Sequence, residues 1–184
     1  MVKKIVAFGA SNSKNSINKQ FAQFVANQLV NAEVTVLDLN DFELPIYSVD
    51  REKNYGIHEN ASSFYKLIKT SDAVIISLAE YNGLHTSAFK NLWDWLSRIS
   101  TKKPMQIWDN KPMFLTSTST SKRPMSNVLR VSKELFPHFG AEIIAHFHLP
   151  SFNHFFNQDK ITESTYLEDF KIQLYKFQTH LNNH

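Results

Sequence analysis

Short apolar runs alternate five times with longer segments whose apolar residues recur at helical spacing. The runs cover residues 3–8, 34–39, 73–79, 113–116 and 141–149. This alternation predicts an α/β fold of three layers, in which a five-stranded parallel sheet lies between helices on both faces. Because no repeat and no linker interrupts the pattern, we expect residues 1–184 to form a single domain.

The helices are expected between and after these strands. Amphipathic stripes predict them near residues 17–29, 57–70, 86–100, 128–136 and 167–181. Ser16 is expected to cap the first helix, because a serine hydroxyl accepts a hydrogen bond from a free amide of the first turn. The connections expected to be irregular cover residues 41–54, 101–112 and 150–160.

Composition excludes several classes of protein. Hydrophobic residues make up 42% of the chain and 15 residues are Phe, so there is enough apolar material for a core. Cysteine is absent, which removes disulfides and thiolate chemistry and fits a reducing cytoplasm. The net charge of +3 comes from scattered residues, which disfavours nucleic-acid binding. No apolar run suits a signal peptide or the roughly 20 residues of a membrane span, so we expect a soluble, cytoplasmic protein.

The stretch from residue 73 to residue 98 joins a strand to a helix through four polar, turn-competent residues. Ala73 to Leu78 is almost wholly apolar, as expected of a strand buried on both faces of a parallel sheet. Glu80-Tyr81-Asn82-Gly83 follows, and helical spacing begins at about Thr86. The tetrapeptide is therefore expected at the carboxyl end of a strand, where open α/β sheets bind ligands.

A second polar loop follows the first strand. Gly9 ends that strand, and residues 10–18 are nearly all small and polar. The free amides and dipole of a helix N-terminus attract a phosphate, and the Ser11, Ser13 and Ser16 hydroxyls and the Asn18 amide would add donors. The alternative is an ordinary turn that only caps the helix. The loop lacks both Gly-Lys-Ser/Thr and G-x-G-x-x-G, so it is neither a Walker A loop nor a dinucleotide fingerprint.

Both loops resemble those of the NADPH-dependent FMN reductases, a flavodoxin-like family that includes chromate, quinone and azo-dye reductases. The match around the third strand comprises Glu80, Tyr81, Asn82, Lys90, Asn91, Asp94 and Trp95. The first loop matches at Ala10, Ser11, Ser16 and Asn18. The chain departs from the family at Ala79 and Thr86, where proline is usual, at Ser13, where arginine is usual, and at residues 121–127, which lack a Gly-Gly pair.

The resemblance implies the strand order 2-1-3-4-5, with FMN bound between the two loops. The residues expected to bind FMN are Ser11, Ser13, Ser16, Ile17, Asn18, Glu80, Tyr81, Asn82, Gly83, Ser117, Thr118 and Ser119. The implied activity passes electrons from NADPH or NADH through FMN to a quinone-like, azo or other small oxidant. No catalytic side chain and no metal ligand is assigned, because the cofactor carries the chemistry.

Two other functions remain open. A flavodoxin-type electron carrier would share the fold, but such carriers are typically strongly acidic, whereas this chain has a net charge of +3. A flavin-free binding or regulatory member of the fold is the second alternative, because the chain lacks the Gly-Gly pair and has Ser13 in place of arginine.

Several side chains have two interpretations each. Tyr81 either packs on the flavin or anchors its loop, and the Glu80 carboxylate could pair with a nearby cation instead of facing the ligand. Lys122 and Arg123 either contact the 2′-phosphate of NADPH or are solvated charges at a helix start. His146 and His148 could contribute to a zinc site, although a His-x-His pair on a strand usually faces solvent or bonds to backbone.

The wide apolar face of the helix expected at residues 86–100 favours association of the chain with another subunit. Its apolar residues span an arc of roughly 160°, wider than the roughly 100° that one sheet covers. The excess, centred on Trp95 and Ile99, predicts a second covering surface. The resemblance implies that this surface is another subunit, in a homodimer or possibly a tetramer. The alternative is that the connection at residues 101–112, with Trp108, folds over this face.

Overall fold

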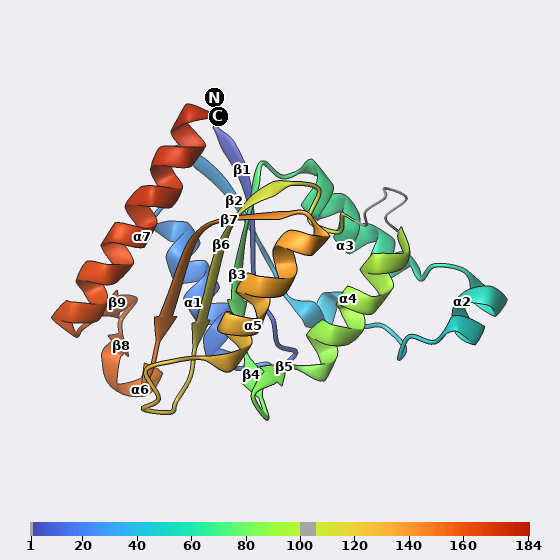
Figure 1. Ribbon diagram of the computed structural model, residues 1–184, viewed down its shortest axis with the longest axis horizontal. Coiled ribbons are helices and arrows are strands. Elements are labelled where there is room, and N and C mark those ends of the chain that lie inside the picture. The colour runs from blue at the N-terminus through green and yellow to red at the C-terminus, as the bar shows by residue number, and fades with distance from the viewer. Residues whose placement is uncertain (1, 100–105) are drawn as a thin grey trace.

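A computed structural model describes residues 2–99 and 106–184 of the chain. The five strands of its parallel sheet are in the order β2-β1-β3-β6-β7, with helices on both faces (Figure 1). The strands are β1 (Lys3–Gly9), β2 (Ala32–Leu37), β3 (Ala73–Leu78), β6 (Lys111–Thr118) and β7 (Ala141–Leu149). The predicted three-layer architecture and strand order 2-1-3-4-5 are confirmed, because β6 and β7 are the fourth and fifth strands of this sheet.

The predicted helices form two layers that enclose the sheet. One face carries α1 (Ile17–Asn27) and α7 (Ser164–Asn183), and the other carries α3 (Glu59–Thr70), α4 (Ser87–Ile99) and α5 (Asn127–Leu135) (Figure 1). Side chains alternate along β1, so that Ile5 and Ala7 join the apolar cluster on the first face, while Val6 and Phe8 join the cluster on the second. In the described part of the chain, no helix combines the length and apolarity needed to cross a membrane.

The prediction of irregular connections was wrong in two places. Residues 41–54 include the end of η1 (Leu39–Phe42) and most of α2 (Val49–Tyr55), and a second 3-10 helix, η2 (Phe136–Phe139), follows α5. Residues 150–160 contain α6 (Phe152–Phe155), β8 (Phe156–Asn157) and the start of β9 (Lys160–Ile161). These elements are short, and α2 buries none of its residues, so no apolar periodicity marks it. Of the third connection, residues 101–105 lie outside the described part.

The burial of Trp95 corrects the argument for association. Its side chain is only 1% exposed within the single chain. The indole Nε1 donates a hydrogen bond to the Pro45 carbonyl at 2.8 Å, and the Tyr47 ring packs on it with centroids 5.3 Å apart. Trp108, the alternative cover, instead lies 5.2 Å from Phe136 between ring centroids. A second covering surface exists as predicted, but residues of the same chain provide it, so Trp95 does not indicate a dimer.

Candidate functional site

Three polar loops meet at the carboxyl edge of the sheet. Gly9 at the end of β1 pairs with Ser77 of β3, and Leu78 of β3 pairs with Ser117 of β6. The loops therefore meet where the strand order reverses between β1 and β3, which is the usual ligand site of open α/β sheets. They enclose a cleft of about 310 Å³ lined by Ser11, Ser13, Asn15, Ser16, Ile17, Asn18, Ala79, Glu80, Tyr81, Thr118, Ser119 and Thr120.

Nine of the twelve residues predicted to bind FMN line this cleft. The other three are Asn82 and Gly83, at the tip of a turn, and Ser117, which is buried. Asn15, Ala79 and Thr120 also line the cleft but were not predicted to bind FMN, although each lies within or beside one of the three loops. The structure thus brings the predicted segments together, while their binding of a cofactor stays a prediction.

The loop after β1 ends in a capped helix with free amides. The Ser16 hydroxyl accepts a hydrogen bond from the Lys19 amide at 3.2 Å, which confirms the predicted N-cap. Within the described residues, the amides of Asn15, Ile17 and Asn18 have no hydrogen-bond acceptor. Unpaired amides at a helix N-terminus can bind a phosphate or carboxylate.

Gly9 allows this helix to begin close to the sheet. A Cβ atom at Gly9 would lie 2.4 Å from the Lys19 amide nitrogen and 2.7 Å from the Asn18 carbonyl carbon. Both contacts are with backbone, so no side chain could move aside to relieve them. A glycine at this position therefore sets how closely the first turn of α1 approaches the end of β1.

Asn18 connects the three loops from within. Its Oδ1 accepts hydrogen bonds from the Ser77 hydroxyl at 2.8 Å and the Thr118 amide at 3.0 Å, and its Nδ2 donates to the Thr118 carbonyl at 3.1 Å. The residue is only 4% exposed. The amide predicted to add a donor for phosphate is thus engaged in holding α1 against β3 and β6.

The polar tetrapeptide after β3 forms a tight hairpin. Glu80–Tyr81 is strand β4 and Leu84–His85 is strand β5, so Asn82 and Gly83 are the two turn residues. Their φ angles of 53° and 82° suit the turn that joins two-residue hairpins, in which asparagine and glycine are favoured. The Tyr81 side chain beside this turn is 52% exposed at the cleft.

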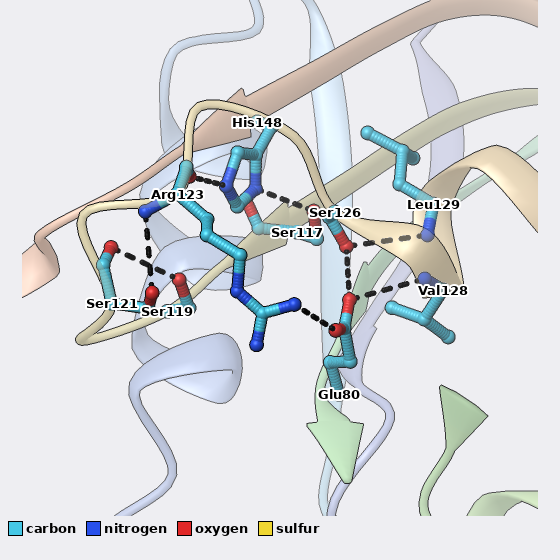
Figure 2. A network of polar contacts seen from close by, with 9 residues as sticks. All are labelled: Glu80, Ser117, Ser119, Ser121, Arg123, Ser126, Val128, Leu129 and His148. Carbon is cyan, nitrogen blue, oxygen red and sulfur yellow. Dashed lines mark hydrogen bonds and ion pairs between the residues drawn. The ribbon is translucent and has the colours of Figure 1, made fainter. Parts of the chain in front are cut away.

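The Glu80 carboxylate links the hairpin to the loop after β6 (Figure 2). Its Oε2 accepts hydrogen bonds from the Ser126 hydroxyl at 3.0 Å and from the Val128 amide at 3.1 Å, at the start of α5. Its Oε1 lies 4.0 Å from Nη1 of Arg123. The predicted alternative of a carboxylate paired with a nearby cation is therefore the observed state of this side chain.

His148 holds the same loop from the end of β7 (Figure 2). Its Nδ1 lies 2.8 Å from the Ser117 hydroxyl and its Nε2 lies 3.3 Å from the Arg123 carbonyl. Burial lowers the pKa of His148, which favours the neutral ring. His146 lies beside Lys133 instead. Across residues 2–99 and 106–184, no group of three His, Cys, Asp or Glu residues could hold a metal ion.

The sheet order and the cleft at its switch point define a flavodoxin-like protein. The chain belongs to the NADPH-dependent FMN reductase family, whose model matches residues 3–154. The family membership predicted from the two loops is thereby confirmed.

Two curated relatives cover parts of the chain. It is 35% identical over 88 residues to an uncharacterized protein of Mycoplasma pneumoniae, with 48% of this chain and 51% of that protein aligned. It is 28% identical over 121 residues to a quinone reductase of Escherichia coli (strain K12), with 63% of this chain and 60% of that protein aligned. The chain thus matches a little over half the length of these relatives.

The fold also resembles that of solved structures. FerB, a flavoenzyme NAD(P)H:(acceptor) oxidoreductase from Paracoccus denitrificans, superposes with a TM-score of 0.76. The comparison covers 100% of this chain and 99% of FerB, at 21% sequence identity. At this identity the likeness concerns the fold alone.

Proposed function

We propose that the chain is an FMN-dependent oxidoreductase that passes electrons from NADPH or NADH to a small oxidant, such as a quinone or an azo compound. Family membership supports this activity. The observation that carries the proposal is the cleft at the strand-order reversal, where a capped helix N-terminus with free amides faces a tight hairpin. The chemistry that FMN supplies when bound is hydride acceptance followed by electron donation.

The phosphate of FMN would be held by the loop from Ser11 to Asn18. The free amides of Ile17 and Asn18 and the hydroxyls of Ser11, Ser13 and Ser16 supply the donors, since Ser13 provides no fixed positive charge. Asn18 contributes through its backbone amide, because its side chain is engaged with Thr118 and Ser77.

The isoalloxazine ring would lie along the remaining walls of the cleft. The backbone of Glu80, Tyr81, Asn82 and Gly83 would bind its polar edge. Thr118 and Ser119 would close the opposite side, with Ser117 buried behind them. Gly83 adopts a φ of 82°, which glycine tolerates without strain, so the tight turn can hold the backbone of the hairpin in place.

The first test is whether the protein purified with FMN is yellow and is bleached anaerobically by NADPH or NADH. Colour should return when a quinone is added. Steady-state rates measured at several donor and acceptor concentrations should give parallel double-reciprocal lines, because one exposed flavin face serves both substrates in turn. Intersecting lines with a detectable ternary complex would contradict alternating use of one site.

The same test separates the alternatives. Flavin that binds but is not bleached by either nicotinamide would favour a flavodoxin-type electron carrier. Failure to bind FMN at micromolar concentration would favour a flavin-free member of the family. The net charge of +3 supports the enzyme over the carrier, since carriers of this kind are typically strongly acidic.

We also propose that residues 1–184 act as one domain, in the cytoplasm, and that two copies form a homodimer. Cysteine is absent from the chain, which fits the location. The resemblance to the family supports the dimer. The exposed side chains of residues 44–58, the segment that covers Trp95, form the surface to test. A tetramer built from two such dimers is the larger assembly to look for in the same measurement.

A further inference from the structure

Figure 2 shows two hydrogen-bonded groups that hold the backbone of Arg123, while its guanidinium extends toward Glu80. Its amide donates a hydrogen bond to the Ser121 hydroxyl at 3.2 Å, and its carbonyl lies 3.3 Å from Nε2 of His148. The side chain, by contrast, is 69% exposed. Because the backbone is held on both sides of the Cα atom, the position of the Cβ atom is fixed. The guanidinium keeps most of its hydrogen-bond donors available.

Arg123 lines a small recess beside the main cleft. The recess measures about 80 Å³ and is lined by Glu80, Thr118, Ser119, Arg123, Met125, Ser126 and His148. Glu80, Thr118 and Ser119 line the main cleft as well. A substrate that reaches FMN bound in the main cleft can therefore extend one polar group into the recess and toward Arg123.

The charge of Arg123 is only loosely engaged by Glu80. The Glu80 carboxylate already accepts hydrogen bonds from Ser126 and from the Val128 amide, at the positive end of the α5 dipole. Arg123 approaches it only to 4.0 Å, and the pair is weak because the Arg123 side chain is 69% exposed to solvent. An anion in the recess can therefore bind Arg123 in place of Glu80. The Glu80 carboxylate would keep its hydrogen bonds from Ser126 and from the Val128 amide.

We propose, on the basis of the proposed function, that Arg123 binds an anionic group of a substrate and gives the site a preference for anionic substrates. The shared chemistry is a phosphate, sulfonate or carboxylate that receives hydrogen bonds from the planar guanidinium. This group belongs either to the nicotinamide donor, as the 2′-phosphate of NADPH, or to the oxidant. Arg123 is then a residue that determines specificity in a loop where the family usually has glycines.

The test compares Arg123→Gln with Lys122→Gln in the FMN-loaded protein. Both variants remove one positive charge from neighbouring exposed residues of one loop, but only Arg123 lines the recess. One arm measures the ratio of kcat/KM for NADPH to that for NADH. The other arm measures the same ratio for a sulfonated naphthoquinone and the unsulfonated parent compound.

We expect Arg123→Gln to lower one of the two ratios about tenfold, the usual effect of losing one charge-assisted hydrogen bond. A fall in the first ratio identifies the 2′-phosphate as the bound group, and a fall in the second identifies the oxidant. The proposal is overturned if neither ratio falls, or if Lys122→Gln lowers the same ratio equally. FMN content is measured in each variant to confirm that loading is matched.

A binding measurement tests the role of Arg123 independently of the proposed activity. NADPH and the sulfonated naphthoquinone are each titrated calorimetrically against the protein as purified, whether or not it turns over. Absence of turnover would count against the proposed activity alone. Equal affinities of wild type and Arg123→Gln for both probes, or no binding of either probe, would overturn the role of Arg123 itself.

Discussion

Asn18 and Thr118 lie 100 residues apart in the chain and are joined by two hydrogen bonds. The side-chain amide of Asn18 donates to the Thr118 carbonyl at 3.1 Å and accepts from the Thr118 amide at 3.0 Å. It therefore pairs with the end of β6 much as a neighbouring strand would. Since Asn18 also belongs to the first turn of α1, this pairing ties the loop after β1 to the opposite wall of the cleft.

Replacing Asn18 by alanine should lower both stability and FMN affinity. The change leaves the Thr118 amide, the Thr118 carbonyl and the Ser77 hydroxyl without these partners in a buried place. We expect a loss of about 2–4 kcal/mol in the free energy of unfolding. Urea denaturation measures this loss, and fluorescence titration with FMN measures the affinity.

Asn15→Ala is the matched control, since Asn15 is an exposed asparagine of the same loop. It should change the free energy of unfolding by no more than about 0.5 kcal/mol. Equal stabilities of the Asn18→Ala and Asn15→Ala proteins would show that the pairing with Thr118 contributes nothing. Ser16→Ala, which removes the N-cap, should cost about 1 kcal/mol and gives an intermediate reference.

Gly9→Ala should displace the N-terminus of α1. The new Cβ atom would lie 2.4 Å from the Lys19 amide nitrogen, so the helix must move away from β1. The free amides of Ile17 and Asn18 would move with it, and we expect FMN affinity to fall at least tenfold along with a loss of stability. Retention of wild-type FMN affinity would mean that the position of this helix does not determine phosphate binding.

Gly56→Ala provides the contrast for that experiment. A Cβ atom there meets nothing within 4 Å, but Gly56 has a φ of 75° and a ψ of −166°, so alanine should cost about 1–3 kcal/mol of stability through backbone strain. Its FMN affinity should equal that of wild type. The pair of variants thus separates a loss of stability from a loss of the binding geometry.

The strands could be predicted because each is a short apolar run bounded by turn residues, whereas their order was implied by the resemblance to the family. The last strand, Ala141–Leu149, coincides with its predicted bounds, since Gly140 precedes it and Pro150 follows it. The two loops of the site were predicted for the same reason. Their polar residues interrupt apolar runs at the carboxyl ends of strands, and parallel strands bring those ends together.

Features that depend on tertiary contacts were not predictable. Helix α2 has no apolar face and is held by side-chain contacts, such as the hydrogen bond from the Tyr47 hydroxyl to Glu52 at 2.9 Å. Glu52 also receives a hydrogen bond from Arg98 at 2.9 Å, across 46 residues of sequence. The apolar arc of α4 indicated that Trp95 needs a cover, but no local pattern shows that residues 44–58 provide it.

The partners of the polar side chains were the least predictable part of the site. Asn18 and Glu80 were each expected near the ligand, and both lie at the cleft. Their hydrogen bonds to Thr118 and Val128 cross from one loop to another, and nothing in the local sequence encodes such pairs. Likewise His148 carries no signal that it would hold the Arg123 carbonyl.

We predict that the protein sediments as a homodimer and that Tyr55→Glu shifts it toward monomer. The segment over Trp95 exposes Ile46 at 79%, Val49 at 55% and Tyr55 at 83%, and several large apolar side chains on one projecting segment favour association. Tyr175→Glu is the control, because Tyr175 is 73% exposed but lies on α7. A wild-type monomer at micromolar concentration, or equal effects of the two variants, would contradict this interface.

The stability of the protein should depend on pH through His85. Its Nε2 lies 2.7 Å from the Ser132 hydroxyl, and its ring stacks on Phe136 with centroids 6.0 Å apart. Burial, with a smaller contribution from Lys90, lowers the pKa of His85 from 6.5 to about 4. The unfolded chain therefore binds a proton at His85 between about pH 6.5 and pH 4, where the folded protein does not.

Because the unfolded state binds more protons in this window, the free energy of unfolding must fall as the pH is lowered through it. We expect His85 to account for a loss of about 1–2 kcal/mol between pH 7 and pH 5, after allowance for solvent screening. Urea unfolding at the two pH values should show a smaller loss for His85→Gln than for wild type. His154→Gln, a change at an exposed histidine, should behave as wild type. If His85→Gln and wild type lose the same stability, the burial of His85 does not control this dependence.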